Sequence, residues 1–251
     1  MTEYVKLNKT DGISTIEFFH PQSNALPGYI LAELAKAIES AGKDNSIKVI
    51  ILKSAGDRAF CAGASFDELI AIDNEDAGKE FFCGFANVIN AARKCPKFII
   101  GRVQGKAVGG GVGMAAATDY CFATKFASAK LSELAIGIGP FVVGPAVKRK
   151  VGNSAFSAMT INASKWFDAN WAKEKGLYTE VFNSADEMDA QIENLATTLS
   201  QSNPEAMKEL KKVMWEGSEN WDTLLMERAE RSGKLVLSDF TKNAIQNFKA
   251  K

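Results

Sequence analysis

The chain has 251 residues, of which 46% are hydrophobic, and its 30 lysines and arginines balance 30 aspartates and glutamates. This apolar content is enough for a sizeable core and argues against a disordered chain. The balanced charge predicts no broad attraction to nucleic acid or to an anionic membrane surface.

Neither export nor metal binding is indicated by the sequence. The N-terminal stretch MTEYVKLNKT lacks the apolar core of a signal peptide, and no run reaches the roughly 18 apolar residues of a membrane span. We therefore expect a soluble, cytoplasmic protein. Its cysteines form no C-x-x-C pair, and its one histidine, His20, is far from them in the sequence, so we expect reduced thiols and no metal site. The cysteines are Cys61, Cys83, Cys95 and Cys121.

The first half of the chain alternates predicted strands with predicted helices. Residues 12–19 alternate apolar and polar side chains and are rich in β formers, which predicts a strand. The continuous apolar runs in 48–56 and 97–105 fit strands buried on both faces of a parallel sheet. Apolar side chains at helical spacing predict helices over 29–42 and 75–95.

Shorter elements lie between and after these. A short helix is expected over 66–72, and one or two short strands within 119–131. After Gly144 and Pro145 the pattern becomes mostly helical, interrupted by one predicted strand over 178–182. Strands alternating with helices indicate an α/β fold with a helical C-terminal part. We place the boundary between a core, 1–200, and a C-terminal helical region, 201–251, at residue 200.

Several helix starts carry capping residues. Asp168 can cap a helix that Gly176 ends, and Ser184 with Glu187 forms a capping box. Asn203 precedes a proline, which favours the first position of a helix. Two further helices are expected to complete the chain.

The stretch RVQGKAVGGGVGMAAATDY, residues 102–120, places five glycines directly before a predicted helix. A helix N-terminus presents unpaired N–H groups, and glycines let a ligand approach the backbone closely. Three interpretations are open: a phosphate loop, one half of an oxyanion hole, or close packing of the helix on a strand. The spacing of Gly111, Gly113 and Ala116 fits the dinucleotide fingerprint, with Glu133 where a ribose-binding acid would stand.

A second stretch, RAFCAGASFDEL over 58–69, is also a turn of small residues between a predicted strand and a helix. Two such turns can meet at the carboxyl ends of parallel strands, where open α/β folds bind ligands. Two backbone N–H donors from different loops would form an oxyanion hole, whereas a single phosphate loop would not need the first turn.

Taken together, four motifs resemble those of the crotonase superfamily, the enoyl-CoA hydratases and isomerases, in order and approximate spacing. They are HPQSNAL (20–26), DRAFCAGAS (57–65), GKAVGGGVGMAAATDY (105–120) and KLSELAIGIGP (130–140). The resemblance covers nearly the whole chain. It implies a spiral of strand-strand-helix units whose C-terminal helical region packs in homotrimers, often paired into homohexamers.

The resemblance also implies roles for particular residues. The N–H groups of Ala64 and Gly110 would form the oxyanion hole, and Ala62 would lie beside the adenine and pantetheine of coenzyme A. The substrate would be an acyl-CoA thioester, with no other cofactor. Phe66 and Phe141 are candidates for the acyl pocket. Two preorganised donors suit an enolate, because losing one such donor typically costs about 10²–10³ in rate.

The carboxylates decide which reaction is expected. Hydratases of this family usually carry two catalytic glutamates, and this chain has Gly113 where the first would stand. The second matches Glu133, whose apolar sequence neighbours predict burial and a raised pKa. One carboxylate is enough to move a proton along an acyl chain, and the segment after Glu133 is similar to the family's isomerases. This pattern favours double-bond isomerisation of an enoyl-CoA.

Other interpretations remain open at this stage. A hydratase or a decarboxylase of the same superfamily could use another acid, and the acidic side chains after the first turn could reach a substrate or form a wet helix face. A dinucleotide-dependent oxidoreductase would use Gly111, Gly113 and Glu133, and a protein that only binds coenzyme A would show no turnover. The acids in question are Asp67, Glu68 and Asp73.

Overall fold

The fold is known from a computed structural model that describes residues 2–249, and it combines twelve strands with ten α-helices and one short 3₁₀ helix in these residues. The strands are β1 (Tyr4–Thr10), β2 (Ile13–Phe19), β3 (Ala25–Leu26), β4 (Val49–Ser54), β5 (Ala59–Cys61), β6 (Gly63–Ala64), β7 (Phe98–Val103), β8 (Lys106–Val108), β9 (Tyr120–Thr124), β10 (Ser128–Lys130), β11 (Phe167–Asp168) and β12 (Glu180–Phe182). The helices are α1 (Gly28–Lys43), α2 (Phe66–Ala71), α3 (Glu75–Lys94), α4 (Gly110–Ala117), η1 (Glu133–Ile136), α5 (Gly144–Ile161), α6 (Ala169–Glu174), α7 (Ala185–Ser200), α8 (Pro204–Met214), α9 (Trp221–Val236) and α10 (Asp239–Lys249).

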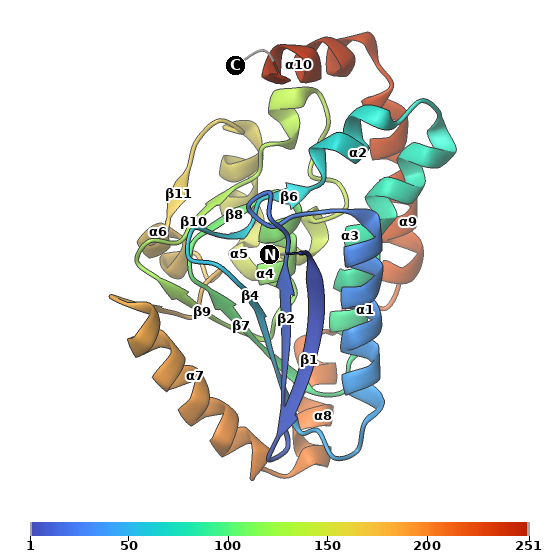
Figure 1. The fold of residues 1–251 in the computed structure, drawn as a ribbon. Coiled ribbons are helices and arrows are strands. Elements are labelled where there is room, and N and C mark those ends of the chain that lie inside the picture. Colours follow the sequence, from blue (N-terminus) through green and yellow to red (C-terminus); the bar gives the residue numbers. More distant parts are fainter. Residues whose placement is uncertain (1, 250–251) are drawn as a thin grey trace.

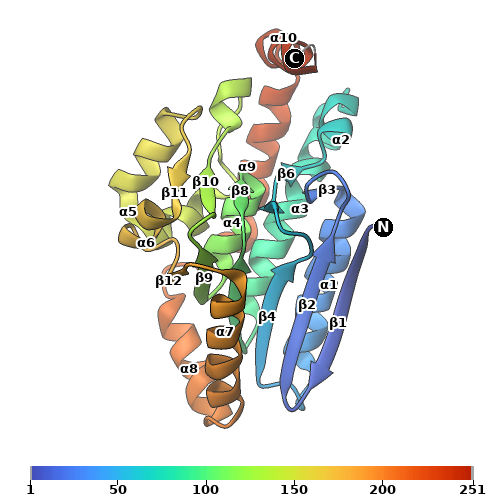
Figure 2. The same ribbon diagram turned by 60° about the vertical axis from the view of Figure 1, so that its left-hand side comes forward.

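A six-stranded sheet in the order β1-β2-β4-β7-β9-β12 forms the base of the fold, and only β1 runs antiparallel to its neighbour. A four-stranded sheet, β11-β10-β8-β5, and the pair β3-β6 lie beyond its carboxyl edge (Figure 2). The chain repeatedly places one strand in the large sheet, the next in a small one, and then a helix. This succession is the predicted spiral of strand-strand-helix units.

Helices cover both faces of the large sheet. In Figure 1, α7 lies on one side of it, and α1, α3 and α9 lie on the other. Central strands therefore bury alternate residues against different layers: Val49 packs with the α7 side, and Ile50 with the main core. This two-sided burial explains the continuous apolar runs of β4 and β7.

The long predicted elements are confirmed. The strands over 12–19, 48–56 and 97–105 and the helices over 29–42 and 75–95 are present with slightly different ends. The expected caps also form, since Asp168, Ser184 and Asn203 each accept a hydrogen bond from a backbone N–H in the first turn of α6, α7 or α8. Strand β1 escaped prediction because most of its side chains are exposed and show no apolar alternation.

Three helices occupy the region after residue 200, and they pack on the core in different ways. α9 runs along α3 so closely that a methyl group on Gly78 would stand 2.7 Å from Gly233 Cα. α10 crosses the far end of the molecule beside η1, and Phe240 and Thr241 contact Gly137 there. The boundary at residue 200 stays a prediction.

A buried ion pair fastens α8 to the large sheet. Lys211 Nζ lies 2.8 Å from Asp119 Oδ2, and both side chains are 3% exposed. The same Asp119 carboxylate accepts hydrogen bonds from Trp215 Nε1 and from the Ile99 N–H, each at 2.8 Å. Lys211 also donates to the Lys97 carbonyl oxygen at 2.7 Å. The pair thus satisfies polar groups of β7, of the residue before β7, and of Trp215 at the C-terminal end of α8.

Removing the cation from this pair is expected to destabilise the fold strongly. In Lys211→Met the Asp119 carboxylate stays buried without its direct ion partner, a change that typically costs about 3–5 kcal/mol of unfolding free energy. Urea denaturation measures the loss. Lys212→Met is the matched control, because the next side chain along α8 is exposed and its ion pair with Glu209 lies in solvent. Equal denaturation midpoints for the two variants would contradict this account.

Candidate active site

A cavity of about 370 Å³ opens where α2, α3, α4 and η1 meet. Its walls combine short backbone segments with apolar side chains and one acid. The backbone segments are Ala62–Ala64 and 108–110, and the acid is Glu133. The apolar side chains include Phe66, Leu69, Phe81, Phe82, Phe85, Ile136, Ile138, Phe141, Val142 and Val143. The cavity therefore brings together all the predicted site residues.

The two predicted turns lie side by side at this cavity. β5 pairs with β8, placing Cys61 opposite Ala107, and each strand leads into one of the turns. Beyond the strands, a methyl group on Gly63 would stand 3.3 Å from the Val108 carbonyl oxygen. The absence of side chains at Gly63 and Gly111 permits this close approach of the two backbones.

The backbone pattern leaves both predicted donors available. Ser65 N–H donates to the Leu26 carbonyl oxygen at 2.9 Å, so Ala64, the preceding residue, directs its N–H away from β3. Gly110 is the first residue of α4, where N–H groups have no partner within the helix. Ala62 differs, because its N–H donates to the Asn24 carbonyl oxygen at 3.2 Å. This N–H is therefore not free to bind a ligand beside Ala62.

Glu133 stands next to the second turn. Gly109 has φ +50°, and a methyl group on it would lie 3.0 Å from Glu133 Oε1. The Gly109 N–H donates to the Lys130 carbonyl oxygen at 2.9 Å, which ties the turn to the strand that leads to Glu133. The carboxylate therefore lies beside Gly109, the residue that immediately precedes the predicted donor Gly110.

The environment of this carboxylate favours its neutral form. Glu133 as a residue is partly exposed, but its Oε2 is shielded from solvent and has no hydrogen-bond partner. Burial raises the pKa of Glu133 to about 7, against a weaker opposing effect of a hydrogen bond to its own backbone. A shielded carboxylate oxygen without a hydrogen-bond partner is unusual, and a pKa near neutrality suits proton transfer.

The position of the missing first glutamate is closed. A methyl group on Gly113 would stand 2.5 Å from Val143 Cγ1 and 3.4 Å from Ile89 Cδ1, so apolar side chains fill the space. Gly111 likewise packs against the Cys61 carbonyl group. Both glycines of the dinucleotide fingerprint are therefore enclosed by protein atoms, and this packing does not support the dinucleotide interpretation.

The other acids considered from the sequence do not line the cavity. Glu68 Oε2 accepts the Gly28 N–H at 2.9 Å, and Asp67 Oδ2 accepts from Gln22 Nε2 at 3.3 Å. Asp73 accepts from the neighbouring Asn74 side chain. Within residues 2–247, whose side chains the structure describes, Glu133 is thus the one acid in the cavity wall.

Sequence reasoning missed three contributors to the cavity. Gly109 carries the positive φ that makes room for Glu133, and the triple glycine could have signalled it. Trp166 and Lys130 also line the cavity, with Lys130 Nζ 5.3 Å from the indole centroid. Lys130 ends β10 and Trp166 precedes β11, and no local sequence pattern predicts that the two side chains meet.

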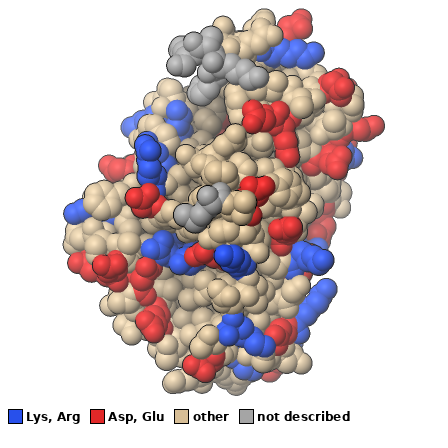
Figure 3. All heavy atoms as spheres, viewed as in Figure 1, with Lys and Arg blue, Asp and Glu red and all other residues tan. Residues whose placement is uncertain are grey.

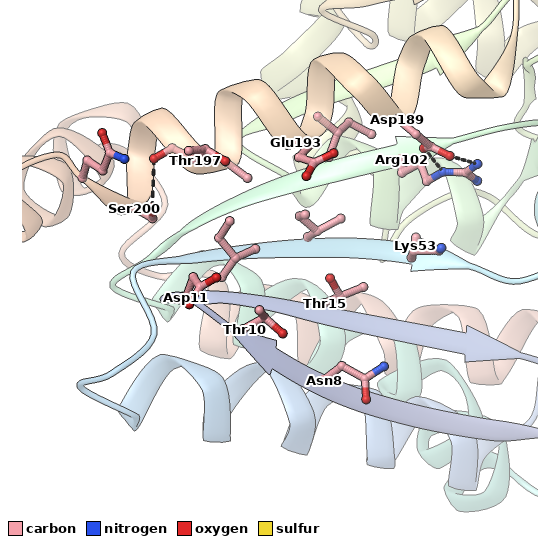
Figure 4. A pocket seen from close by; sticks show the side chains of 15 residues that line it. Asn8, Thr10, Asp11, Thr15, Lys53, Arg102, Asp189, Glu193, Thr197 and Ser200 are labelled. Carbon is pink, nitrogen blue, oxygen red and sulfur yellow. Dashed lines mark hydrogen bonds and ion pairs between the residues drawn. The ribbon is translucent and has the colours of Figure 1, made fainter.

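A larger groove of about 750 Å³ lies elsewhere, between α7 and the strands β1, β2, β4 and β7 of the large sheet. Figure 4 shows its polar side chains, with Arg102 bonded to Asp189 through two nitrogen atoms. Lys53 pairs with Glu17 at 3.1 Å. None of the predicted site residues lines this groove, and its principal cations are already paired.

Neither a metal cluster nor a membrane-spanning helix is found in the described part of the chain. No group of three or more His, Cys, Asp or Glu side chains there could hold a metal ion, and no helix there is long and apolar enough to cross a membrane. On the face shown in Figure 3, acidic and basic side chains are interspersed without a continuous basic surface.

The spiral of strand-strand-helix units around this cavity is the crotonase fold. The chain belongs to the enoyl-CoA hydratase/isomerase family, whose model matches residues 8–249. A crystal structure of an enoyl-CoA hydratase from Bacillus halodurans superposes with a TM-score of 0.90 at 22% identity, covering 97% of this chain and 99% of the other.

Characterised relatives catalyse different reactions. The chain is 29% identical to the peroxisomal Delta(3,5)-Delta(2,4)-dienoyl-CoA isomerase of Arabidopsis thaliana, over 76% of this chain and 72% of that protein. It is also 29% identical to the carnitinyl-CoA dehydratase of Escherichia coli, over 85% of this chain and 80% of that protein. The resemblance to the family is confirmed, while the particular reaction and the roles of the site residues stay predictions.

Proposed function

We propose that this protein is an enoyl-CoA isomerase that moves a double bond along an acyl-CoA thioester with one carboxylate. Two observations together support the proposal: Glu133 lies beside Gly109, and apolar side chains fill the space next to Gly113. One acid faces the cavity, and Val143 and Ile89 occupy the space in which a second would stand.

In this mechanism the thioester oxygen accepts hydrogen bonds from the Ala64 and Gly110 N–H groups. The Glu133 carboxylate removes a proton from the carbon next to the thioester carbonyl of a β,γ-enoyl-CoA. The electron pair shifts toward the oxygen, giving a dienolate that the two donors stabilise. Protonated Glu133 then returns the proton to the γ carbon, which leaves the conjugated α,β-enoyl-CoA. The reaction is balanced without a further cofactor.

The cavity lining supports an apolar acyl group. Phe66 and Phe141, the predicted acyl-pocket residues, contribute to the wall together with the aromatic side chains of α3. Phe81 and Phe82 meet edge to face at 5.0 Å, and the Phe85 ring contacts Gly110. Moving an uncharged hydrocarbon chain from water into contact with these apolar walls is favourable.

Product analysis tests the proposal. The enzyme is incubated separately with β,γ-enoyl-CoA, with α,β-enoyl-CoA and with a carboxylated acyl-CoA, and products are identified by mass and by absorbance. We expect the first substrate to yield a same-mass conjugated enoyl thioester and the second to gain no water. A water adduct would identify a hydratase, loss of carbon dioxide from a carboxylated acyl-CoA a decarboxylase, and binding without turnover a protein that only binds coenzyme A.

The turnover of this isomerase is expected to rise with pH through about 7. Glu133 must be ionised to accept the proton, and burial holds its pKa near 7. A profile of kcat/KM from about pH 5.5 to 8.5 should therefore climb tenfold per unit on the acid side and level off above about pH 7.5. A flat profile across this range would rule out Glu133 as the base.

The homotrimeric or homohexameric assembly and the cytoplasmic location stay predictions. Exposed apolar side chains support self-association, because Leu134, Ile161 and Phe240 are 48%, 76% and 67% exposed. They lie on η1, at the end of α5 and on α10. Light scattering of the purified protein distinguishes a monomer from a trimer or hexamer.

A further inference from the structure

Two buried side-chain amides hold the segment that leads to Ala64, although neither lines the cavity. Asn24, from the turn between β2 and β3, is 3% exposed, and Gln104, from the turn between β7 and β8, is 4% exposed. Both donate hydrogen bonds to the connection between β4 and β6. Nothing in the proposed chemistry requires them to touch the substrate.

Asn24 binds this segment through both its side chain and its backbone. Its Nδ2 donates to the carbonyl oxygens of Ala55 and Ala59, each at 3.0 Å. Its Oδ1 accepts the His20 N–H at 2.7 Å, and its own carbonyl oxygen accepts the Ala62 N–H. Asn24 has φ +58°, a left-handed conformation that asparagine tolerates better than most residues.

Gln104 also binds this segment through its side-chain amide. Its Nε2 lies 2.9 Å from Ser54 Oγ, 3.0 Å from the Gly56 carbonyl oxygen and 3.1 Å from the Ala59 carbonyl oxygen. Its backbone carbonyl accepts the Thr124 hydroxyl at 2.7 Å, which fixes the turn to β9. The Ala59 carbonyl oxygen is thus shared by the two amides.

These bonds restrain the segment between β4 and β6, whose glycines would otherwise allow its backbone to move. Gly56 and Gly63 both have positive φ, so the chain turns sharply on each side of β5. Without the amides, the carbonyl groups of Ala55, Gly56 and Ala59 would lack these donors, and the loss would cost most at Ala59, which is buried. A shift of the segment would carry Ala64 with it, and a displacement of about 1 Å at a reacting centre can cost about 10² in rate.

We propose that Asn24 and Gln104 are positioning residues that fix the direction of the Ala64 N–H toward the thioester oxygen. The inference rests on the proposed function, because it assumes that Ala64 is an oxyanion donor. It assigns to two residues outside the cavity a share of the transition-state stabilisation. A purely structural role would lower stability but leave the polarisation of bound thioester unchanged.

Asn24→Asp and Gln104→Glu test the proposal with almost no change of shape. Each replaces an NH₂ donor with an oxygen that faces carbonyl oxygens. Gln22→Glu is the matched control, since it makes the same change in the same turn at an exposed side chain that bonds Asp67 instead. We expect kcat to fall about 10–100-fold in the two test variants, with KM changed less than about threefold and the pH profile preserved. The control should keep wild-type kcat.

A readout that does not depend on turnover separates this inference from the proposed function. The ¹³C chemical shift of the thioester carbonyl in bound, saturated [1-¹³C]acyl-CoA reports its polarisation. We expect a downfield shift in the wild-type complex and in Gln22→Glu, and a smaller shift in the two test variants. A wild-type complex without the shift would overturn the oxyanion assignment itself. A wild-type shift that persists in both test variants would overturn only the positioning role.

The stability of each variant is measured alongside. Gln104→Met removes the donor without adding a charge, so it decides the question in the same two assays if either acidic variant fails to fold. A folded Gln104→Met protein with wild-type kcat and carbonyl shift would contradict the proposal.

Discussion

Glu133→Gln is expected to lower the turnover of enoyl-CoA by about 10²–10⁴-fold, the range that general acid–base catalysis contributes. The amide keeps the size of the carboxylate but cannot accept the proton. No other acid lines the cavity within the described residues to replace it. Affinity for coenzyme A should change little, because the backbone of the two turns is untouched. Steady-state kinetics and calorimetric titration with coenzyme A measure the two quantities.

Glu68→Gln is the control for this experiment. Glu68 lies on α2, just after the first turn, and binds the Gly28 N–H instead of facing the cavity. It should retain turnover within a few-fold of wild type. If Glu133→Gln turned over substrate at a rate close to that of Glu68→Gln, the proton-transfer role of Glu133 would be wrong.

The same variant has an expected effect on stability that does not involve substrate. The folded-state pKa of Glu133 is raised to about 7, so the folded protein holds this proton more tightly than the unfolded chain does. The free energy of unfolding therefore falls as pH rises from the usual carboxyl range through 7. Glu133→Gln stays neutral. We expect it to be more stable than wild type at about pH 8, by on the order of 1–3 kcal/mol, and similar at about pH 4.5. Urea denaturation at the two pH values tests the sign, and an equal difference at both would contradict it.

Much of the fold could be predicted because local patterns and tertiary environment agree. The first residues of β4 and β7 form continuous apolar runs because this part of each strand is covered on both faces, by α7 and by the α1 side. The two-residue strands β3, β6 and β11 could not be predicted, since they are shorter than any periodicity. β1 is held by pairing with β2 rather than by burial, so its side chains gave no signal.

The candidate site divides in a similar way. The two glycine-containing turns are local features, and a sequence shows them. Their convergence depends on the pairing of β5 with β8, which no spacing along the chain encodes. The 3₁₀ helix η1, which begins at Glu133, packs against α10, a helix from the other end of the chain, and no local pattern predicts this contact. Asn24 lies within the motif HPQSNAL, but its bonds to Ala55 and Ala59 form only in the folded chain.

Gly109→Ala is expected to lower turnover about 10²–10³-fold, comparable to the loss of an oxyanion donor. Two effects combine at this residue. Its φ of +50° is unfavourable for alanine, and the added methyl group would lie 3.0 Å from Glu133 Oε1 and 3.4 Å from Cδ. The carboxylate, the turn, or both must move, so the base and the Gly110 N–H lose their relative placement.

Gly217→Ala separates backbone strain from displacement of the carboxylate. Gly217 has φ +81°, yet an added methyl group there meets no atom within 4 Å. Both variants therefore carry a left-handed alanine, and both should lose some thermal stability. Only Gly109→Ala should lose turnover and show an altered pH profile, because only its methyl group contacts Glu133. Parallel losses of turnover in the two proteins would mean that strain alone is responsible and that the contact between Gly109 and Glu133 has no part in catalysis.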